Sequence, residues 1–196
     1  MNFEPSGIYH IYNRGHNRQP IFFGPHNYDY FLKKVKKHFL PYCDVICYCL
    51  MPNHFHFLVQ VCDDYPTPLA PEDHLSNVVK LSPFSQEFVF NNSIGKMISS
   101  YAQAINKQEK RIGALFQEKT KAKNLYDGLN YMEHRDVLSI TPIVRCFSYI
   151  HNNPVAAKIV RSPELWEYSS FKEYLGLRRN GICNKRLFFD LIGGMG

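Results

Sequence analysis

The sequence predicts an α+β domain built on an antiparallel sheet. Segments with strand-like alternation are interspersed with segments of helical spacing, which is typical of mixed folds. Two of the strand-like segments are joined by only three residues, Met51-Pro52-Asn53. A connector this short favours an antiparallel hairpin, because parallel strands need a crossover of about a dozen residues or more. The length of 196 residues is enough for one compact domain with its own core.

Three strands and one helix are expected in the first part of the chain. Residues 7–14 alternate and are rich in β-formers, so they predict a strand. Residues 26–39 carry apolar side chains at helical spacing, and Pro41 cannot continue that helix. Residues 43–50 and 54–61 are the two arms of the predicted hairpin.

The second part of the chain is less regular. Four prolines interrupt residues 62–94, which we interpret as a Pro-rich insertion or loop with a short helix near His74–Leu81. A helix, a strand with a basic outer face and another helix then follow at residues 95–109, 114–125 and 142–152. Residues 1–196 are therefore expected to form a single domain with this insertion and with a C-terminal tail from about residue 177.

The composition suits a polyanionic partner. Lys and Arg outnumber Asp and Glu by 23 to 17, which gives a net charge of +6. The aromatic content of 15% could serve to stack unpaired bases or to build the core.

No apolar stretch reaches the roughly 20 residues of a membrane helix. The N-terminus MNFEPSGIYH lacks the basic and apolar regions of a secretory signal. We therefore expect a cytoplasmic protein with no membrane partner.

The six cysteines predict no disulfide and no paired zinc motif. None of them forms a C-x-x-C pair, which weakens but does not remove a zinc site as an alternative. Cys43, Cys47 and Cys49 fall on odd positions, as an alternating strand would place them on one face. We interpret the cysteines as small, reduced and largely buried side chains.

The sequence His54-Phe55-His56 begins the second arm of the predicted hairpin. Side chains two apart on a strand point the same way, so His54 and His56 share one face and Phe55 and Phe57 share the other. Two imidazoles on one face suit two ligands of one cation. The alternative is a pair of half-exposed histidines at a strand end.

Tyr149 and Asn153 are four residues apart on a predicted helix and therefore share a face, with Arg145 one turn earlier. A separate apolar stripe is formed by Ile143, Cys146, Phe147 and Ile150. Pro154 disfavours helical geometry at the preceding residue, which predicts that Asn153 lies at the helix end. Its amide oxygen could bind a hard cation or could simply cap the helix.

Together the two segments predict a metal site with an adjacent nucleophile. Two histidines and one amide oxygen leave coordination positions for phosphate and water, and this donor set suits Mg²⁺ or Mn²⁺. Tyr149, one helical turn from a ligand, would attack a phosphodiester that the metal polarises. Tyr101 is a rival nucleophile, but Asn106 follows it by five residues, a poorer helical match, so we interpret Tyr101 as packing.

These segments resemble a known family. Residues 50–59, LMPNHFHFLV, resemble the HUH motif of single-tyrosine transposases, and residues 149–160, YIHNNPVAAKIV, resemble the tyrosine helix of their REP-associated branch. Shorter likenesses follow the same order at residues 9–15, 113–119 and 168–171. The resemblance extends from about residue 7 to residue 176.

The resemblance implies a ferredoxin-like antiparallel sheet with the HUH motif on a central strand. It implies single-stranded DNA as substrate, often beside a hairpin, and a 5′-phosphotyrosine intermediate on Tyr149 that a second transfer resolves. His54, His56 and Asn153 carry over as ligands of the divalent metal. Many relatives act as dimers, so the resemblance also implies a possible homodimer.

Several basic residues are candidates for phosphate contact. We expect DNA binding by Arg14, Arg145, Lys119, Lys121 and Lys123, of which Arg14 and Arg145 are favoured by their positions, although such residues can also be solvated charges. Two other functions remain open at this stage. One is a catalytically silent nucleic-acid-binding module, and the other is a metal-dependent nuclease that uses water.

Overall fold

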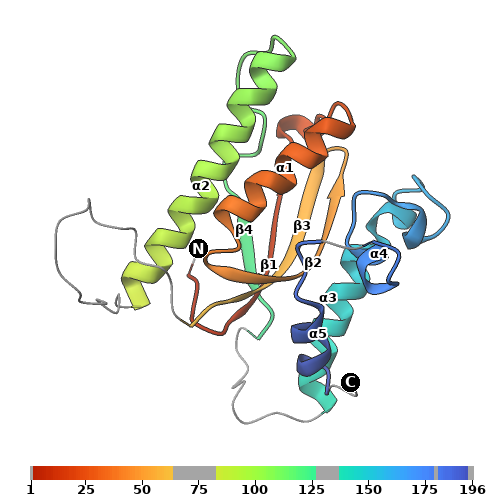
Figure 1. Ribbon diagram of the computed structural model, residues 1–196. Coiled ribbons are helices and arrows are strands. Elements are labelled where there is room, and N and C mark those ends of the chain that lie inside the picture. The colour runs from red at the N-terminus through yellow and green to blue at the C-terminus, as the bar shows by residue number, and fades with distance from the viewer. Residues whose placement is uncertain (1, 64–82, 127–136, 179–180, 194–196) are drawn as a thin grey trace.

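The computed structural model describes residues 2–63, 83–126, 137–178 and 181–193 (Figure 1). Its strands are β1 (Ile8–Arg14), β2 (Cys43–Met51), β3 (His54–Val61) and β4 (Lys121–Asn124). Its helices are α1 (Pro25–His38), α2 (Pro83–Gln108), α3 (Val137–Ala156), α4 (Phe171–Tyr174) and α5 (Lys185–Leu191), with short 3-10 turns at His16–Arg18 and Pro163–Leu165.

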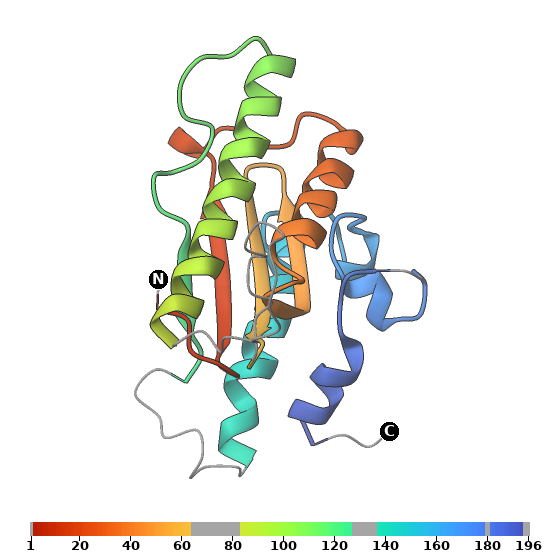
Figure 2. The same cartoon turned by 60° about the vertical axis from the view of Figure 1, so that its left-hand side comes forward.

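The four strands form one antiparallel sheet in the order β2-β3-β1-β4. Strands and helices alternate along the chain as β1-α1-β2-β3-α2-β4, and this succession with this strand order is the ferredoxin-like arrangement. Helices α1 and α2 cover one face of the sheet, and α3 lies against the other (Figures 1 and 2). The predicted fold class is therefore confirmed, and β3 is one of the two central strands.

The first core lies between the sheet and helices α1 and α2. Phe55 and Phe57 of β3 contribute to it together with Phe31 of α1 and Tyr101 of α2, all of them fully buried. Burial of each large apolar side chain contributes roughly 1.5–3 kcal/mol, which is why this face of β3 is uniformly apolar. The predicted alternation of β3 is confirmed.

The second core lies between the sheet and α3. Ile143, Cys146 and Ile150 of α3 pack with Cys47 and Leu58 of the sheet, and Phe147 packs at the edge of this cluster. The apolar stripe predicted for the tyrosine helix is therefore confirmed. Because this stripe packs against the sheet, the opposite side of α3, which carries Tyr149, faces solvent.

The cysteines of β2 do not share one face, and that prediction is wrong. A β-bulge between Val45 and Cys47 shifts the pairing with β3 by one residue. Cys43 consequently faces the first core, whereas Cys47 and Cys49 face the second. A bulge breaks the period of two locally, which counting odd positions could not reveal.

Element boundaries differ from the predictions where turns and packing decide them. Helix α2 begins at Pro83 rather than at Gly95, so residues 83–94 of the predicted insertion are helical. Of the predicted strand 114–125, residues 121–124 form β4, and Phe116 adds only an isolated β-bridge to Gly15. The short helix predicted near His74–Leu81 lies outside the described residues.

The described part of the predicted C-terminal tail packs against the sheet. The backbone of Cys183 forms an isolated β-bridge with Val45 of β2. The backbone amide of Asn184 donates to the Val45 carbonyl at 2.8 Å. Within the described ranges, no helix is long and apolar enough to cross a membrane.

Candidate active site

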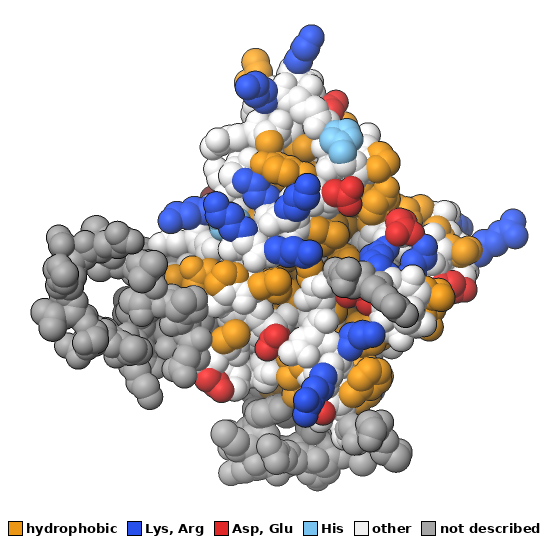
Figure 3. All heavy atoms as spheres, in the orientation of Figure 1, with side chains coloured by type: hydrophobic (Ala, Val, Ile, Leu, Met, Phe, Trp, Pro, Cys, Tyr) orange, Lys and Arg blue, Asp and Glu red, His pale blue; other side chains and the backbone are white. Residues whose placement is uncertain are grey.

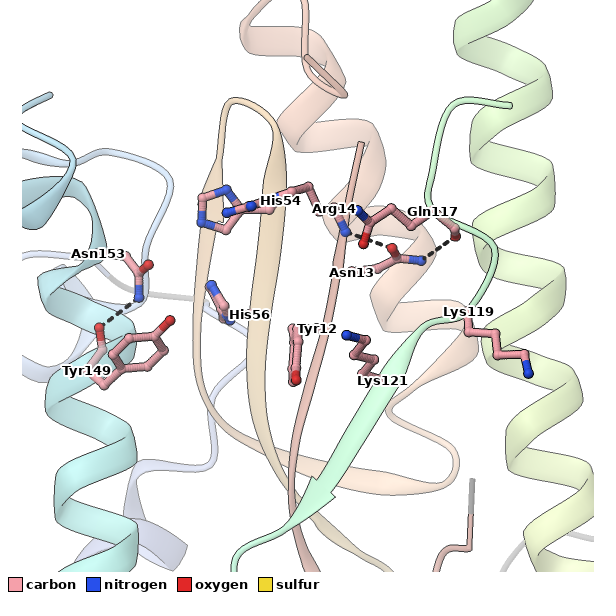
Figure 4. Close-up of a pocket in the computed structure, with 10 residues that line it drawn as sticks. All are labelled: Tyr12, Asn13, Arg14, His54, His56, Gln117, Lys119, Lys121, Tyr149 and Asn153. Atoms are coloured by element: carbon pink, nitrogen blue, oxygen red, sulfur yellow. Dashed lines mark hydrogen bonds between the residues drawn. The ribbon is translucent and has the colours of Figure 1, made fainter. Parts of the chain in front are cut away.

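A pocket of about 250 Å³ opens on the side of the sheet that α3 covers (Figure 4). Antiparallel pairing brings Tyr12 opposite His56 and Arg14 opposite His54, so alternate residues of β1 and β3 point into one space. The pocket is lined by Tyr12, Asn13, Arg14, His54, His56, Gln117, Lys119, Lys121, Tyr149 and Asn153. The structure thus unites the predicted nucleophile, all three predicted metal ligands and three of the predicted cations.

The imidazole of His54 is oriented by its neighbour in the hairpin turn. Asn53 Nδ2 donates to the Arg18 carbonyl at 3.0 Å, which leaves its Oδ1 to accept from His54 Nδ1 at 2.6 Å. His54 Nε2 is then the nitrogen free to face Asn153, whose side chain also interacts with His54. Burial and the nearby Arg14 guanidinium lower the pKa of His54, and the contact with Asn153 partly opposes them.

The imidazole of His56 is buried and is held by a third histidine. His10 Nε2 lies 2.8 Å from His56 Nδ1, so one of the two rings donates and the other accepts. Burial lowers the pKa of His56 to about 2, with further lowering by His10, His54 and Arg14. Burial and Lys123 lower the pKa of His10 to about 4. Both rings are therefore neutral at physiological pH.

Tyr149 projects from α3 over the histidine pair. Its side chain is 55% exposed, and its ring centroid lies 5.6 Å from that of His56 and 6.0 Å from that of His10. One turn further along, Asn153 Nδ2 donates to the Tyr149 carbonyl at 2.8 Å. That bond turns the amide oxygen of Asn153 towards His54 (Figure 4).

Asn153 does not end the helix, contrary to the sequence prediction. Helix α3 continues to Ala156, and the Ala157 amide donates to the Asn153 carbonyl at 2.9 Å. Pro154 lacks the N–H that would bond the carbonyl four residues earlier, but it does not prevent the next turn from forming. Pro142 likewise lies inside α3, which begins at Val137 and not at residue 142 as predicted.

A buried hydrogen-bond network fixes α3 relative to the sheet. His151, 1% exposed, lies with its Nε2 2.8 Å from Ser170 Oγ. Ser170 Oγ in turn accepts from the Tyr48 amide of β2 at 2.9 Å. The His151 ring also packs edge-on against Phe147. This network lies on the side of α3 that faces the protein and so determines where Tyr149 points.

The predicted cations occupy different positions around the site. Arg14, Lys119 and Lys121 line the pocket, and Lys123 pairs with His10 across β1 and β4 beside it. Arg145 is exposed on α3 and does not line the pocket. Their contact with DNA remains a prediction, and it is geometrically most direct for the three residues that line the pocket.

Sequence reasoning missed several residues of the site. Tyr12 and Gln117 line the pocket, Asn53 orients His54, and His10 bonds His56. Buried Asn13 donates to Thr120 Oγ1 at 3.0 Å and so holds the segment before β4 against β1. Alternation along β1 was the available signal, because it places His10, Tyr12 and Arg14 on one face.

The rival nucleophile is excluded by its position. Tyr101 is fully buried in the first core, on the opposite face of the sheet, and its hydroxyl donates to the Ile21 carbonyl at 2.8 Å. Burial raises its pKa, and Tyr28 and Tyr30 raise it further. The interpretation of Tyr101 as a packing residue is confirmed.

Among the described residues, no group of three or more His, Cys, Asp or Glu side chains is arranged to hold a metal ion. The candidate donor set instead consists of two imidazoles and one amide oxygen. Within that part of the chain the cysteines are all free, and Cys43, Cys47, Cys49 and Cys146 are buried.

No protein-family model matches the sequence, and no curated protein matches it. Among solved structures, the chain is similar to a REP-associated tyrosine transposase bound to a REP hairpin. The two share 12% sequence identity with a TM-score of 0.53, over 91% of this chain and 86% of the other. The resemblance predicted from the sequence is thus confirmed for the fold, which this chain shares with that transposase.

Buried His151 makes the stability of the protein sensitive to acid. Burial lowers its folded-state pKa to about 3, below the unfolded value of about 6.5, so only the unfolded state gains a proton as the pH falls below 6.5. Between pH 7 and pH 5 this histidine should cost roughly 2 kcal/mol of unfolding free energy. Urea denaturation at the two pH values should show a smaller difference for His151→Gln than for the wild type. The exposed His16→Gln variant should keep the full difference, and equal pH dependence in both variants would contradict the assignment.

Proposed function

We propose that the chain is a single-tyrosine HUH transposase of the REP-associated branch, which cleaves and rejoins single-stranded DNA through a bond between Tyr149 and a 5′ phosphate. The observation that carries the proposal is the convergence of Tyr149 with the two histidines of β3 in one basic pocket. A fold shared with a transposase bound to a DNA hairpin supports the substrate class.

The donor set fits a divalent cation. With His54 Nδ1 engaged by Asn53, the lone pair of Nε2 faces the amide oxygen of Asn153, so two acceptors confront each other. A cation held by these two atoms would remove this conflict. His56 completes the set when its Nδ1 donates to His10, because its Nε2 then carries the lone pair. Mg²⁺ or Mn²⁺ bound there supplies Lewis-acid polarisation of the scissile phosphate and stabilises charge in the transition state.

The side chains of the pocket would perform the remaining steps. The Tyr149 oxygen attacks the phosphorus and releases its proton to solvent, to which the side chain is open. The bond from phosphorus to the 3′ oxygen breaks, and that oxygen takes up a proton as a 3′-hydroxyl. A 3′-hydroxyl then attacks the phosphotyrosine, which restores the phenol and rejoins the strand. The ester conserves the bond energy, so no nucleotide hydrolysis is needed.

Arg14, Lys119 and Lys121 would hold the phosphates that flank the cleavage point. The partly buried ring of Tyr12 forms a wall on which an unpaired base could stack. Homodimer assembly and a cytoplasmic location remain predictions from the sequence.

Tyr149→Phe should abolish the covalent intermediate, because the attacking oxygen is removed while the ring is kept. Incubation with labelled single-stranded hairpin DNA and Mn²⁺, followed by denaturing electrophoresis, should show an adduct for the wild type. The variant should lose cleavage on the order of 10³-fold or more. Tyr101→Phe, the same change on the opposite face of the sheet, should retain the adduct. Cleavage that survives Tyr149→Phe would instead identify a nuclease that uses water, and binding without cleavage by the wild type would identify a silent module.

Metal affinity should depend on His54 and Asn153 in the absence of DNA. Titration calorimetry with Mn²⁺ should show at least tenfold weaker binding for His54→Ala, whereas His16→Ala, an exposed control, should leave the affinity unchanged. Asn153→Asp should bind more tightly than the wild type, because a carboxylate oxygen adds charge at the same position. Weaker binding by Asn153→Asp would argue against Asn153 as a ligand.

His10 should control metal binding without touching the metal, because its Nε2 lies 2.8 Å from Nδ1 of His56 and, as the acceptor of that hydrogen bond, would fix the tautomer of that ring. His10→Leu removes the acceptor and should weaken Mn²⁺ binding roughly 10- to 100-fold. His10→Gln offers an amide oxygen as acceptor and should recover most of the affinity. Equal losses in both variants, with unchanged thermal stability, would mean that His10 is itself a ligand.

A further inference from the structure

A second concave surface lies between α1 and α2, on the opposite face of the sheet from the pocket. We call it the helix groove. Its lining includes Lys34, Lys37 and His38 of α1 and Asn92, Lys96 and Gln103 of α2. None of the ten described residues that line it is acidic, and none is Phe, Tyr or Trp. Figure 3 shows Lys and Arg side chains gathered over this side of the molecule.

The groove arises from the amphipathic character of the two helices. Phe31 and Val35 of α1 and Met97 and Tyr101 of α2 turn into the first core. The polar residues between them must therefore face outward. Within the described part of the chain, Lys34, Lys37 and Lys96 form no ion pair. No carboxylate in that part of the chain therefore neutralises them, although Lys34 Nζ also lies over the Tyr30 ring, 5.2 Å from its centroid.

The pKa of His38 is sensitive to the positive electrostatic potential of the groove. Its Nδ1 lies 3.3 Å from Ser93 Oγ of α2, which places the imidazole between the helices. Burial lowers the pKa of His38, and Lys37, Lys34 and Lys96 each lower it further. Lysines from both helices therefore act on the same point, and their positive potentials add.

We propose that the helix groove is a second nucleic-acid site, which holds the sugar-phosphate backbone of double-helical DNA without reading its sequence. Lysines, amides and hydroxyls are the groups that contact phosphates and sugars. Unpaired bases are held by stacking on aromatic rings, and the groove offers none of the three aromatic side chains that serve this purpose best. The pocket on the other face differs in that it does offer aromatic rings, those of Tyr12 and Tyr149.

This inference goes beyond the proposed function, because it requires neither the metal nor Tyr149. Duplex DNA carries a charge about every 1.7 Å along its axis, so lysines one helical turn apart meet neighbouring phosphates of any sequence. A segment of duplex on this face would tether the protein to DNA while a single strand occupies the pocket.

Helix α1 provides a matched pair of variants. Lys34 and Lys37 line the groove, whereas Lys33 and Lys36 line a different surface of the same helix. Binding of a mixed-sequence blunt duplex is measured by fluorescence anisotropy in EDTA over a series of salt concentrations. Lys34→Gln/Lys37→Gln should weaken binding on the order of tenfold at about 0.1 M salt and should reduce the slope of log K against log salt by about 2. Lys33→Gln/Lys36→Gln carries the same change in charge and should reduce the slope by less than half as much.

Two further measurements distinguish binding of duplex DNA in the helix groove from a nonspecific effect of the lowered net charge. The pKa of His38, followed by NMR, should rise when the duplex binds, because the phosphates offset the three lysines. Binding of a single-stranded thymidine oligomer should be affected less by Lys34→Gln/Lys37→Gln than binding of the duplex. Equal effects of the two lysine pairs on the duplex, an unchanged pKa of His38, or equal effects on single-stranded and duplex DNA would overturn the proposal. Because EDTA suppresses metal-dependent chemistry, these results are independent of whether Tyr149 forms an adduct.

Discussion

The pairing register of β1 with β3 is the constraint on which the site depends. It sets Tyr12 opposite His56 and Arg14 opposite His54, so that pocket residues of both strands share the face towards α3. Phe55 and Phe57, between and after the histidines, are buried on the other face. A slip of one residue would expose these phenylalanines and bury the imidazoles against α1 and α2. The hydrophobic core therefore enforces the geometry of the site, although no pocket residue belongs to that core.

The position of α3 is the second constraint, and it is satisfied by contacts on the side of the helix away from Tyr149. Small side chains at Cys47 and Cys49 of β2 lie where the helix packs, and the buried bond between His151 and Ser170 fixes its rotation. A side chain that is 55% exposed cannot be fixed by its own packing. The direction of Tyr149 is thus set by buried residues one and two positions along the helix.

The sequence was sufficient wherever a period repeats over many residues. It predicted β1, β2, β3 and α1 almost to their boundaries, and it predicted that His54, His56, Tyr149 and Asn153 belong together. It failed where one local event overrides the period, as at the bulge between Val45 and Cys47 and at Pro154, which α3 passes through. Contacts between distant segments could not be predicted from the sequence either. The hydrogen bond between His10 and His56, for example, depends on the pairing register of β1 with β3, which neither strand encodes alone.

Burial is the main reason why the histidines of the pocket are available as ligands, and the nearby cations add to its effect. Burial lowers the pKa of His54, His56 and His10, Arg14 lowers that of His54 and His56 further, and Lys123 does the same for His10, so the three rings stay neutral. A neutral imidazole retains the lone pair that a metal requires, and a protonated ring does not. The same positive charges would attract a phosphate backbone. Arg14 therefore serves the attraction of the anion rather than the binding of the metal, because burial alone would still keep the histidines unprotonated after its loss.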